Sequence, residues 1–445
     1  MRHGRKSGPL FAALALAATS AACGGWWSSR PAATSSPAPQ GARGSADLQT
    51  APYEPGKTRA IIRELEEKIK QNPEDFVAHN KLSAYYMQLF REVDDDRLIA
   101  TAEQYARASL QILPADQNQG ALSALAETEK ATHRFAEARD HALQLIRLGP
   151  QKPYPRALLF DALFELGDYD GATKALDDLR RIAGDSLTLW PREARFAIIH
   201  GRLEEARQHL ARSLSQAQAL SIPQTEPVAW AQWQTGETYF AAGDYESAER
   251  HFREALKTEP NNRAALAALA RARFARGDSD EAVRLYEQIV KVAPHPEFTG
   301  PLGDLYKLAG RDADAQAQYE QAERDGSKSA HDNRTLALFY ADHDLKLEEA
   351  YERARREYDK RRDIYTADAL AWAASKAGRH DEARERAKEA TRLGTKDARL
   401  LYHAGMIALA AGDADAGRAQ LRRALQLSPG FDPFQSRLAR KALGE

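Results

Sequence analysis

The sequence predicts an all-α protein built as a solenoid of antiparallel helix hairpins, and three observations support this prediction. Ala, Leu, Arg and Glu dominate the composition, β-branched residues are sparse, and charged residues make up 29% of the chain, which suits solvent-faced helices. A glycine followed by a polar residue recurs at a period of 34 residues. The same pattern of small and aromatic residues surrounds each of these glycines. A chain of 445 residues is also too long for one compact core, which favours a repeat array.

Residues 1–22 have the layout of an export signal. Basic side chains within 2–6 precede an apolar stretch over 9–18, and the small residues 19–22 lead directly into Cys23. Because the apolar stretch is too short to span a bilayer permanently, we expect a lipoprotein-type signal peptide that is removed. Cys23 is the one cysteine of the chain, which excludes an intramolecular disulfide and a cysteine-based zinc site.

The residues Thr-Ser-Ala-Ala-Cys at 19–23 resemble the lipobox of bacterial lipoproteins, in which the cysteine is lipidated and becomes the mature N-terminus. Ser20 stands where leucine is usual. Two alternatives therefore remain open: cleavage by an ordinary signal peptidase after Ala22, and no export at all. The resemblance also implies that Gly24, in place of aspartate, directs the protein to the outer membrane of a cell that has one. We predict that Cys23 is lipidated.

Residues 23–56 are rich in Gly, Pro, Ser and Ala, and we expect them to form a disordered tether. They offer little apolar surface to offset the entropy lost on ordering. A flexible chain of this length spans roughly 30–35 Å, enough to hold a folded body away from lipid headgroups. Trp26 and Trp27 either lie at the membrane interface, where indole rings are favoured, or are exposed in the linker.

Seven Gly-polar pairs mark the turns of predicted helical hairpins. Glycine can end a helix in the left-handed conformation, and a following aspartate can cap the next helix by accepting backbone N–H bonds. Successive pairs are separated by 34, 42, 34, 33, 68 and 34 residues, and the interval of 68 contains a copy without glycine near Asp344. The glycines of the seven pairs are Gly167, Gly201, Gly243, Gly277, Gly310, Gly378 and Gly412.

The residues around these turns form a recurring framework. In one unit it consists of Gly236, Tyr239, Gly243, Ala248, Phe252, Ala255 and Pro260. This framework resembles the tetratricopeptide repeat, a helical hairpin of 34 residues. The resemblance implies a right-handed superhelical solenoid of about ten hairpins. Small residues would let the paired helices approach closely, aromatic residues would fill the space between pairs, and proline would end each unit.

The repeats divide the chain into segments. We assign 57–75 to an N-terminal capping helix, 76–434 to the solenoid and 435–445 to a C-terminal capping helix. The ten predicted units begin near Phe76, Gln119, Pro153, Leu187, Ala229, Arg263, Pro296, His331, Ile364 and Ala398. Because one hairpin cannot bury its apolar face alone, each unit must stack on its neighbours.

The sequence contains no recognisable catalytic motif. There is no P-loop, no GxGxxG and no HExxH. The nearest approach to a metal cluster, Asp342-His343-Asp344, falls where a hairpin turn belongs, so we interpret it as a helix-capping turn. We also expect no deep closed pocket in which carboxylate pKa values could be tuned. We therefore predict that the protein is not an enzyme and uses no cofactor and no metal.

In the family that the repeats resemble, the first helices of successive units line a concave groove that takes partner peptides. Carrying the groove positions over gives nine candidate binding residues: Trp230, Trp233, Glu237, Phe240, Tyr365, Asp368, Trp372, Tyr402 and Met406. A weaker third group is Tyr154, Asp161 and Phe164. Aromatic side chains make good interface anchors. The alternative is that these rings pack against the neighbouring first helix.

These observations favour a membrane-tethered scaffold that mediates protein–protein interactions in the bacterial cell envelope, on its periplasmic or outer-membrane side. The alternative is a soluble regulatory or sensory module of the cytoplasm that binds peptides. The 63 Lys and Arg residues nearly balance the 64 Asp and Glu residues, which gives no basic excess for a nucleic-acid-binding face. We expect other proteins as partners, the membrane through the lipid anchor, and no nucleic acid.

Overall fold

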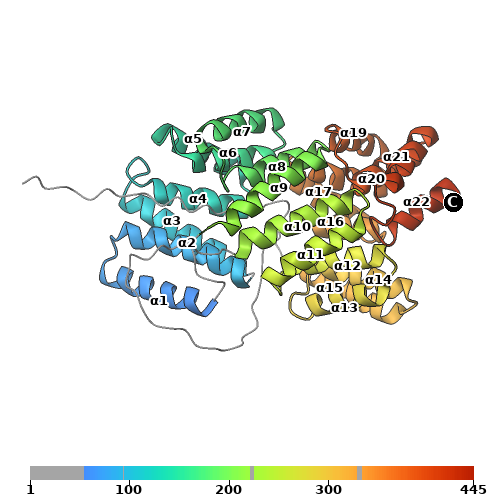
Figure 1. Ribbon diagram of the computed structural model, residues 1–445, viewed down its shortest axis with the longest axis horizontal. Coiled ribbons are helices and arrows are strands. Elements are labelled where there is room, and N and C mark those ends of the chain that lie inside the picture. Colours follow the sequence, from blue (N-terminus) through green and yellow to red (C-terminus); the bar gives the residue numbers. More distant parts are fainter. Residues whose placement is uncertain (1–54, 94, 221–224, 328–332) are drawn as a thin grey trace, which may run out of the picture.

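The computed structural model describes residues 55–93, 95–220, 225–327 and 333–445, and this part of the chain folds into 22 α-helices without strands (Figure 1). The predicted signal peptide, Cys23 and the tether up to residue 54 lie outside the described residues. Within the described part, no helix combines the length and apolar character that a membrane span requires. The predicted all-α solenoid is confirmed.

Helices α2 to α21 form ten antiparallel pairs, with α1 packed on the first pair and α22 on the last. Seven of the ten first helices begin at the residue that opens the predicted unit. The helices are α1 (Pro55–Gln71), α2 (Phe76–Val93), α3 (Arg97–Ile112), α4 (Gln119–Ala131), α5 (Phe135–Leu148), α6 (Pro153–Glu165), α7 (Tyr169–Ala183), α8 (Trp190–Ile199), α9 (Leu203–Gln218), α10 (Thr225–Ala241), α11 (Tyr245–Thr258), α12 (Arg263–Ala275), α13 (Ser279–Val290), α14 (Pro296–Leu308), α15 (Asp312–Gly326), α16 (Asn333–Asp342), α17 (Leu347–Lys360), α18 (Ile364–Lys376), α19 (His380–Thr391), α20 (Ala398–Ala410), α21 (Ala414–Leu427) and α22 (Gln435–Leu443).

The hairpin turns have the geometry that the Gly-polar pairs predict. All seven glycines adopt positive φ, between 69° and 90°. At four turns the following aspartate caps the second helix; Asp168, for example, accepts a bond from the Gly171 N–H at 2.8 Å. In the hairpin without glycine, Asp344 itself adopts a φ of 54°. The left-handed backbone conformation is therefore preserved at this turn even though the residue is not glycine.

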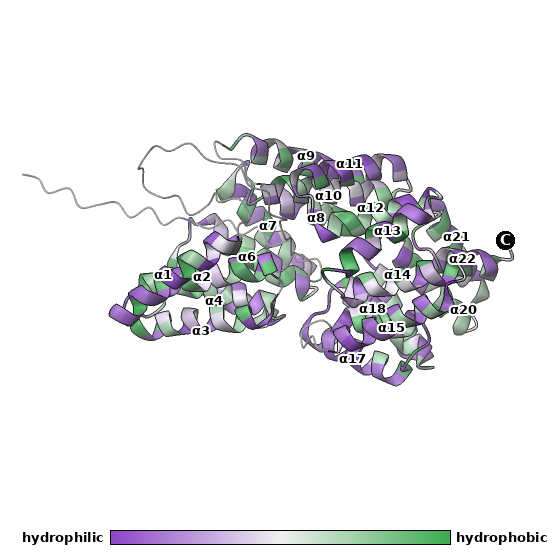
Figure 2. Ribbon diagram, turned by 90° about the horizontal axis from the view of Figure 1, so that it is seen from below, coloured by the Kyte–Doolittle hydropathy of each residue, from purple (hydrophilic) through white to green (hydrophobic). Residues whose placement is uncertain are grey.

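Small residues bring the two helices of each hairpin together. In the pair α10–α11, a Cβ added at Gly236 would collide with the ring of Phe252, and Ala248 and Ala255 are fully buried. Apolar side chains thus form the buried core between the helices, and hydrophobic and hydrophilic residues alternate along the helices (Figure 2). This is the packing that the repeat pattern predicts.

The solenoid winds so tightly that repeats five to six positions apart touch. Three hairpin turns, 165–169, 199–201 and 240–245, lie against the connections that follow α17, α19 and α21. Residues joined by these contacts are separated by 183 to 225 positions in the chain. We call this line of contacts the closure seam. From each of these turns to the next, the connection that it contacts also moves forward by one repeat. The offset between turn and connection is constant, so one superhelical turn takes between five and six repeats.

Glycine allows the close approach at the seam. A Cβ on Gly167, Gly201 or Gly243 would lie within 3.0 Å of a backbone carbonyl oxygen on the opposite side: that of Arg362, Gly394 and Leu427, respectively. The four turn glycines outside the seam, at 277, 310, 378 and 412, have nothing within 4 Å. The same sequence marker therefore serves two purposes: it forms every turn, and at three turns it also permits contact between superhelical turns.

Candidate functional site

The concave face of the solenoid encloses a cavity of about 540 Å³. Its wall is formed by eight successive first helices, the even-numbered helices from α6 to α20, together with residues of the closure seam and the segment before α22. The cavity is more sheltered than the open groove that the sequence predicts, but it remains partly open to solvent and is not a closed pocket. The contact between superhelical turns closes the groove on one side.

Five of the nine candidate groove residues lie on the cavity wall. Trp233, Glu237 and Phe240 come from α10, and Tyr365 and Asp368 come from α18. Trp233 to Phe240 share one face because they are spaced three and four residues apart. The wall also contains Phe164 of the weaker third group.

The other four candidates lie in packed cores. Trp230 is buried beside Ala194 and Leu210 between two first helices. Trp372 and Tyr402 are buried in the core of the last three hairpins, and Met406 packs against that core. For these four residues the geometry fits packing against the neighbouring helices rather than exposure to a ligand.

Glu237 holds two neighbouring side chains of the cavity wall in place. Its Oε1 accepts hydrogen bonds from Trp233 Nε1 at 3.1 Å and from Arg271 Nη2 at 2.5 Å. The guanidinium of Arg271 also lies 4.9 Å from the ring centroid of Phe240, a cation–π contact. One carboxylate thus fixes an indole and a guanidinium in the orientation that they present to the cavity.

A second polar cluster surrounds Asp342 at the end of α16. Asp342 accepts hydrogen bonds from Arg399 at 2.5 Å and from the Trp372 indole at 2.8 Å. The buried His403 ring lies 2.8 Å from Asp368 and 3.8 Å from Asp342. Burial alone would lower the pKa of His403, but the two carboxylates raise it to about 9. His403 is therefore a cation at neutral pH.

His343 is a further charged residue on the wall. Its Nε2 lies 2.8 Å from Asp304 Oδ1, and its Nδ1 lies 2.7 Å from the carbonyl oxygen of Phe339. Burial lowers the pKa of His343, but the hydrogen bond and charge of Asp304 outweigh this and raise it to about 9. Asp342 ends α16 and residues 343–344 form the predicted turn, yet Asp342 and His343 line the cavity instead of capping a helix. Among the described residues, no group of His, Cys, Asp or Glu is arranged to hold a metal ion.

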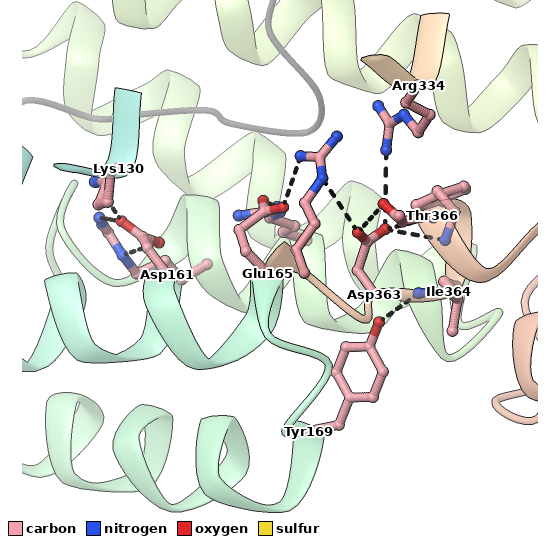
Figure 3. Close-up of polar contacts among 12 residues, drawn as sticks. Lys130, Asp161, Glu165, Tyr169, Arg334, Asp363, Ile364 and Thr366 are labelled. Carbon is pink, nitrogen blue, oxygen red and sulfur yellow. Dashed lines mark hydrogen bonds and ion pairs between the residues drawn. The ribbon is translucent and has the colours of Figure 1, made fainter. Parts of the chain in front are cut away.

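The closure seam adds Glu165 and Asp363 to the charged wall, and Arg361 lies behind them (Figure 3). Arg361, only 2% exposed, reaches Glu165 at 3.2 Å across the seam, and also Glu357 at 3.1 Å and Asp363 at 3.7 Å on its own side. Tyr169 accepts a hydrogen bond from the Ile364 N–H at 3.0 Å across the same seam. No repeat motif predicts these contacts, because they join hairpins far apart in the sequence.

Three models of the tetratricopeptide repeat family match the chain, over residues 185–259, 239–300 and 369–430. The matched segments are tetratricopeptide repeats. They include repeats on both sides of the closure seam. Tetratricopeptide repeats indicate a scaffold for protein–protein interactions, which agrees with a wall made of first helices.

Solved structures of similar fold include the human IFIT1 dimer with m7Gppp-AAAA, at a TM-score of 0.50 and 15% sequence identity over 76% of this chain and 78% of that chain. A monomeric IFIT1 mutant with Gppp-AAAA is similar at a TM-score of 0.50 and 14% identity, over 75% of this chain and 76% of that one. At this identity the likeness shows the fold alone. No curated protein matches the chain in sequence.

Proposed function

We propose that the protein is a membrane-tethered scaffold of the bacterial cell envelope that holds an extended segment of a partner protein in its central cavity. The observation that carries this proposal is the cavity wall, which is built from eight successive first helices of the repeats. Its volume of about 540 Å³ falls within the roughly 300–1,000 Å³ of ligand pockets. A short extended segment fits such a space, and a folded domain does not.

The charge of the wall favours protein over RNA as the occupant. IFIT1 was solved with RNA, so RNA is the alternative that structural likeness raises. The wall of this cavity contains five Arg and Lys residues against nine carboxylates: Glu165, Glu237, Glu297, Asp304, Asp342, Asp363, Asp368, Asp397 and Asp432. Phosphate groups require a basic surface, and an acidic wall repels them. We therefore propose a protein segment, rather than RNA, as the occupant of the cavity.

The tether follows from the pattern before Cys23. We expect Cys23→Ala to release the protein from the membrane fraction, because the thiol that would carry the lipid is lost. Cell fractionation followed by immunoblotting measures this. A control substitution of Ser28, beside the cysteine in the tether, should leave the membrane fraction unchanged. Membrane association that persists in Cys23→Ala would refute the anchor and favour the soluble alternative.

Filling the cavity tests the binding function. Ala264, near the start of α12, lines the cavity, and a tryptophan there would occupy part of it. We expect Ala264→Trp to reduce co-purification of envelope proteins with the full-length chain by at least about tenfold, which is about 1.4 kcal/mol of binding. The melting temperature should change little, because the new ring enters open space.

The matched control is Ala136→Trp, which adds the same ring at an exposed position of α5 outside the cavity. This variant should capture partners as the unsubstituted chain does. If Ala264→Trp and Ala136→Trp capture the same proteins in equal amounts, the cavity is not the binding site.

A further inference from the structure

One end of the cavity carries more negative than positive charge. Five carboxylates from five different parts of the chain meet there: Asp304, Asp342, Asp368, Asp397 and Asp432. The cations among them are Arg399, His343 and His403. Lys396 also lines the cavity, next to Asp397 in the chain. The acidic side chains still outnumber the basic ones, five to four. This end is formed by α14, α16, α18, α20 and the segment before α22.

In the described part of the chain, Asp397 and Asp432 are the two acidic residues of this end without a cationic partner. Among the described residues neither carboxylate forms an ion pair; each accepts backbone N–H bonds at the start of a helix, at 2.8 to 3.2 Å. The charge of Arg399 acts on both carboxyl groups, but Arg399 forms its ion pair with Asp342, at 2.5 Å. Burial raises the pKa of both carboxyl groups, and the charge of Asp368 raises that of Asp397 further. Burial therefore disfavours the ionised form of both groups in the protein without a ligand.

Capping does not explain why both residues are aspartate. Asparagine caps a helix about as well as aspartate does, so a neutral residue would serve the same structural purpose. A positive charge that a ligand brought to this end of the cavity would favour the ionised form of both groups. Such unbalanced charge on a cavity wall is typical of binding sites.

The wall beside the two carboxylates suits a long aliphatic stem. Phe339, Tyr365 and Phe431 line the same end of the cavity. Lysine and arginine side chains bury their methylene groups against such surfaces while their charged ends remain at polar groups. A divalent metal ion fits less well, since the described residues contain no cluster arranged to hold one.

We propose that this acidic end of the cavity recognises a lysine or arginine side chain of the extended partner segment, with Asp397 and Asp432 as its counter-charges. The inference rests on the proposed function, because it names the chemistry of the segment that the cavity binds. The ammonium or guanidinium group would lie between the two carboxylates, and its stem would pack on the aromatic wall. Binding should therefore weaken as salt concentration rises.

The test uses the full-length protein and a synthetic library of randomised pentapeptides. We expect the selected peptides to be enriched in lysine and arginine over the input library. For a selected peptide, the double variant Asp397→Asn with Asp432→Asn should bind at least about tenfold more weakly, while its melting temperature stays equal or rises. Replacing the basic residue of that peptide by norleucine should have the same effect on the unsubstituted protein.

The matched control is Asp413→Asn, which changes a capping aspartate of α21 that lies outside the cavity wall. This variant should bind the selected peptide normally. Free spermidine, which has ammonium groups without a peptide backbone, should compete only weakly.

The outcomes separate the two proposals. Selected peptides without basic enrichment, or unchanged binding to the double variant, would overturn this inference and leave the proposed function intact. Tight binding of spermidine without any peptide selection would overturn both, since the cavity would then be a small-amine site. If no peptide is selected over the Ala264→Trp variant, peptide binding by the cavity itself fails.

Discussion

Replacing Arg361 by alanine is expected to lower the free energy of unfolding by about 3–5 kcal/mol, the cost of removing one partner from a buried ion pair. Arg361 is almost fully buried and lies among Glu165, Glu357 and Asp363. Its loss would leave three carboxylates without their shared cation at the closure seam. Urea titration followed by circular dichroism measures the change.

The control for this experiment is Arg284→Ala. Arg284 forms an ion pair with Glu281 three residues away, but its side chain is 71% exposed. Exposed pairs of this kind contribute about 0–1 kcal/mol, so this variant should unfold almost as the unsubstituted protein does. If Arg361→Ala costs no more than Arg284→Ala, the seam does not contribute to stability in solution.

Acid should weaken the same network. Burial alone would raise the pKa of Glu357, but the hydrogen bond with His133 and the charge of Arg361 lower it to about 2. A carboxyl group whose pKa is lower in the folded state stabilises the fold above its unfolded pKa, about 4.3. That contribution is lost as the pH falls from there toward 2. The seam is therefore expected to open before the individual hairpins unfold in acid.

The local fold could be predicted from the sequence because each hairpin depends on nearby residues. The turn glycines, the capping aspartates and the small residues between paired helices, such as Gly236, all lie within one repeat, and the structure has them as predicted. The alternation of small and aromatic side chains was sufficient to place them.

The closure of the superhelix could not be predicted in the same way. Whether Gly167 meets Arg362 depends on the rotation between neighbouring repeats, summed over five to six of them. A small error in each rotation moves the two surfaces apart. Nothing in the local sequence distinguishes Gly167, which is in the seam, from Gly277, which is not. The cavity and its charged wall follow from closure, so they were missed as well.

Only some of the residues on the cavity wall could be predicted, because the orientation of each first helix also depends on how it packs against its neighbours. Trp230 and Trp233 lie on the same helix and differ by about 60° around its axis. That difference is sufficient to bury Trp230 between helices and to place Trp233 on the cavity wall. An aromatic pattern identifies the helix. The rotation of that helix about its axis, relative to its neighbours, decides which ring is available to a ligand.

The turn glycines provide the most direct test of closure, because two of them differ only in what lies opposite. Gly167 and Gly277 both adopt positive φ, at 72° and 90°. Alanine at either position costs roughly 1–2 kcal/mol from the left-handed backbone. At Gly277 that is the whole cost, since the new methyl group meets open space. At Gly167 the methyl group would collide with the carbonyl oxygen of Arg362, and overpacking adds roughly 1–3 kcal/mol.

We therefore expect Gly167→Ala to destabilise the protein more than Gly277→Ala does, by that additional 1–3 kcal/mol or so. A local measurement separates the seam from the rest of the fold. The Ile364 N–H is bonded to Tyr169 across the seam, so its hydrogen exchange should accelerate in Gly167→Ala and stay slow in Gly277→Ala. Equal stabilities and equal exchange rates in the two variants would show that the superhelix is open in solution. The cavity would then be a groove, and its acidic end would be reached from the side.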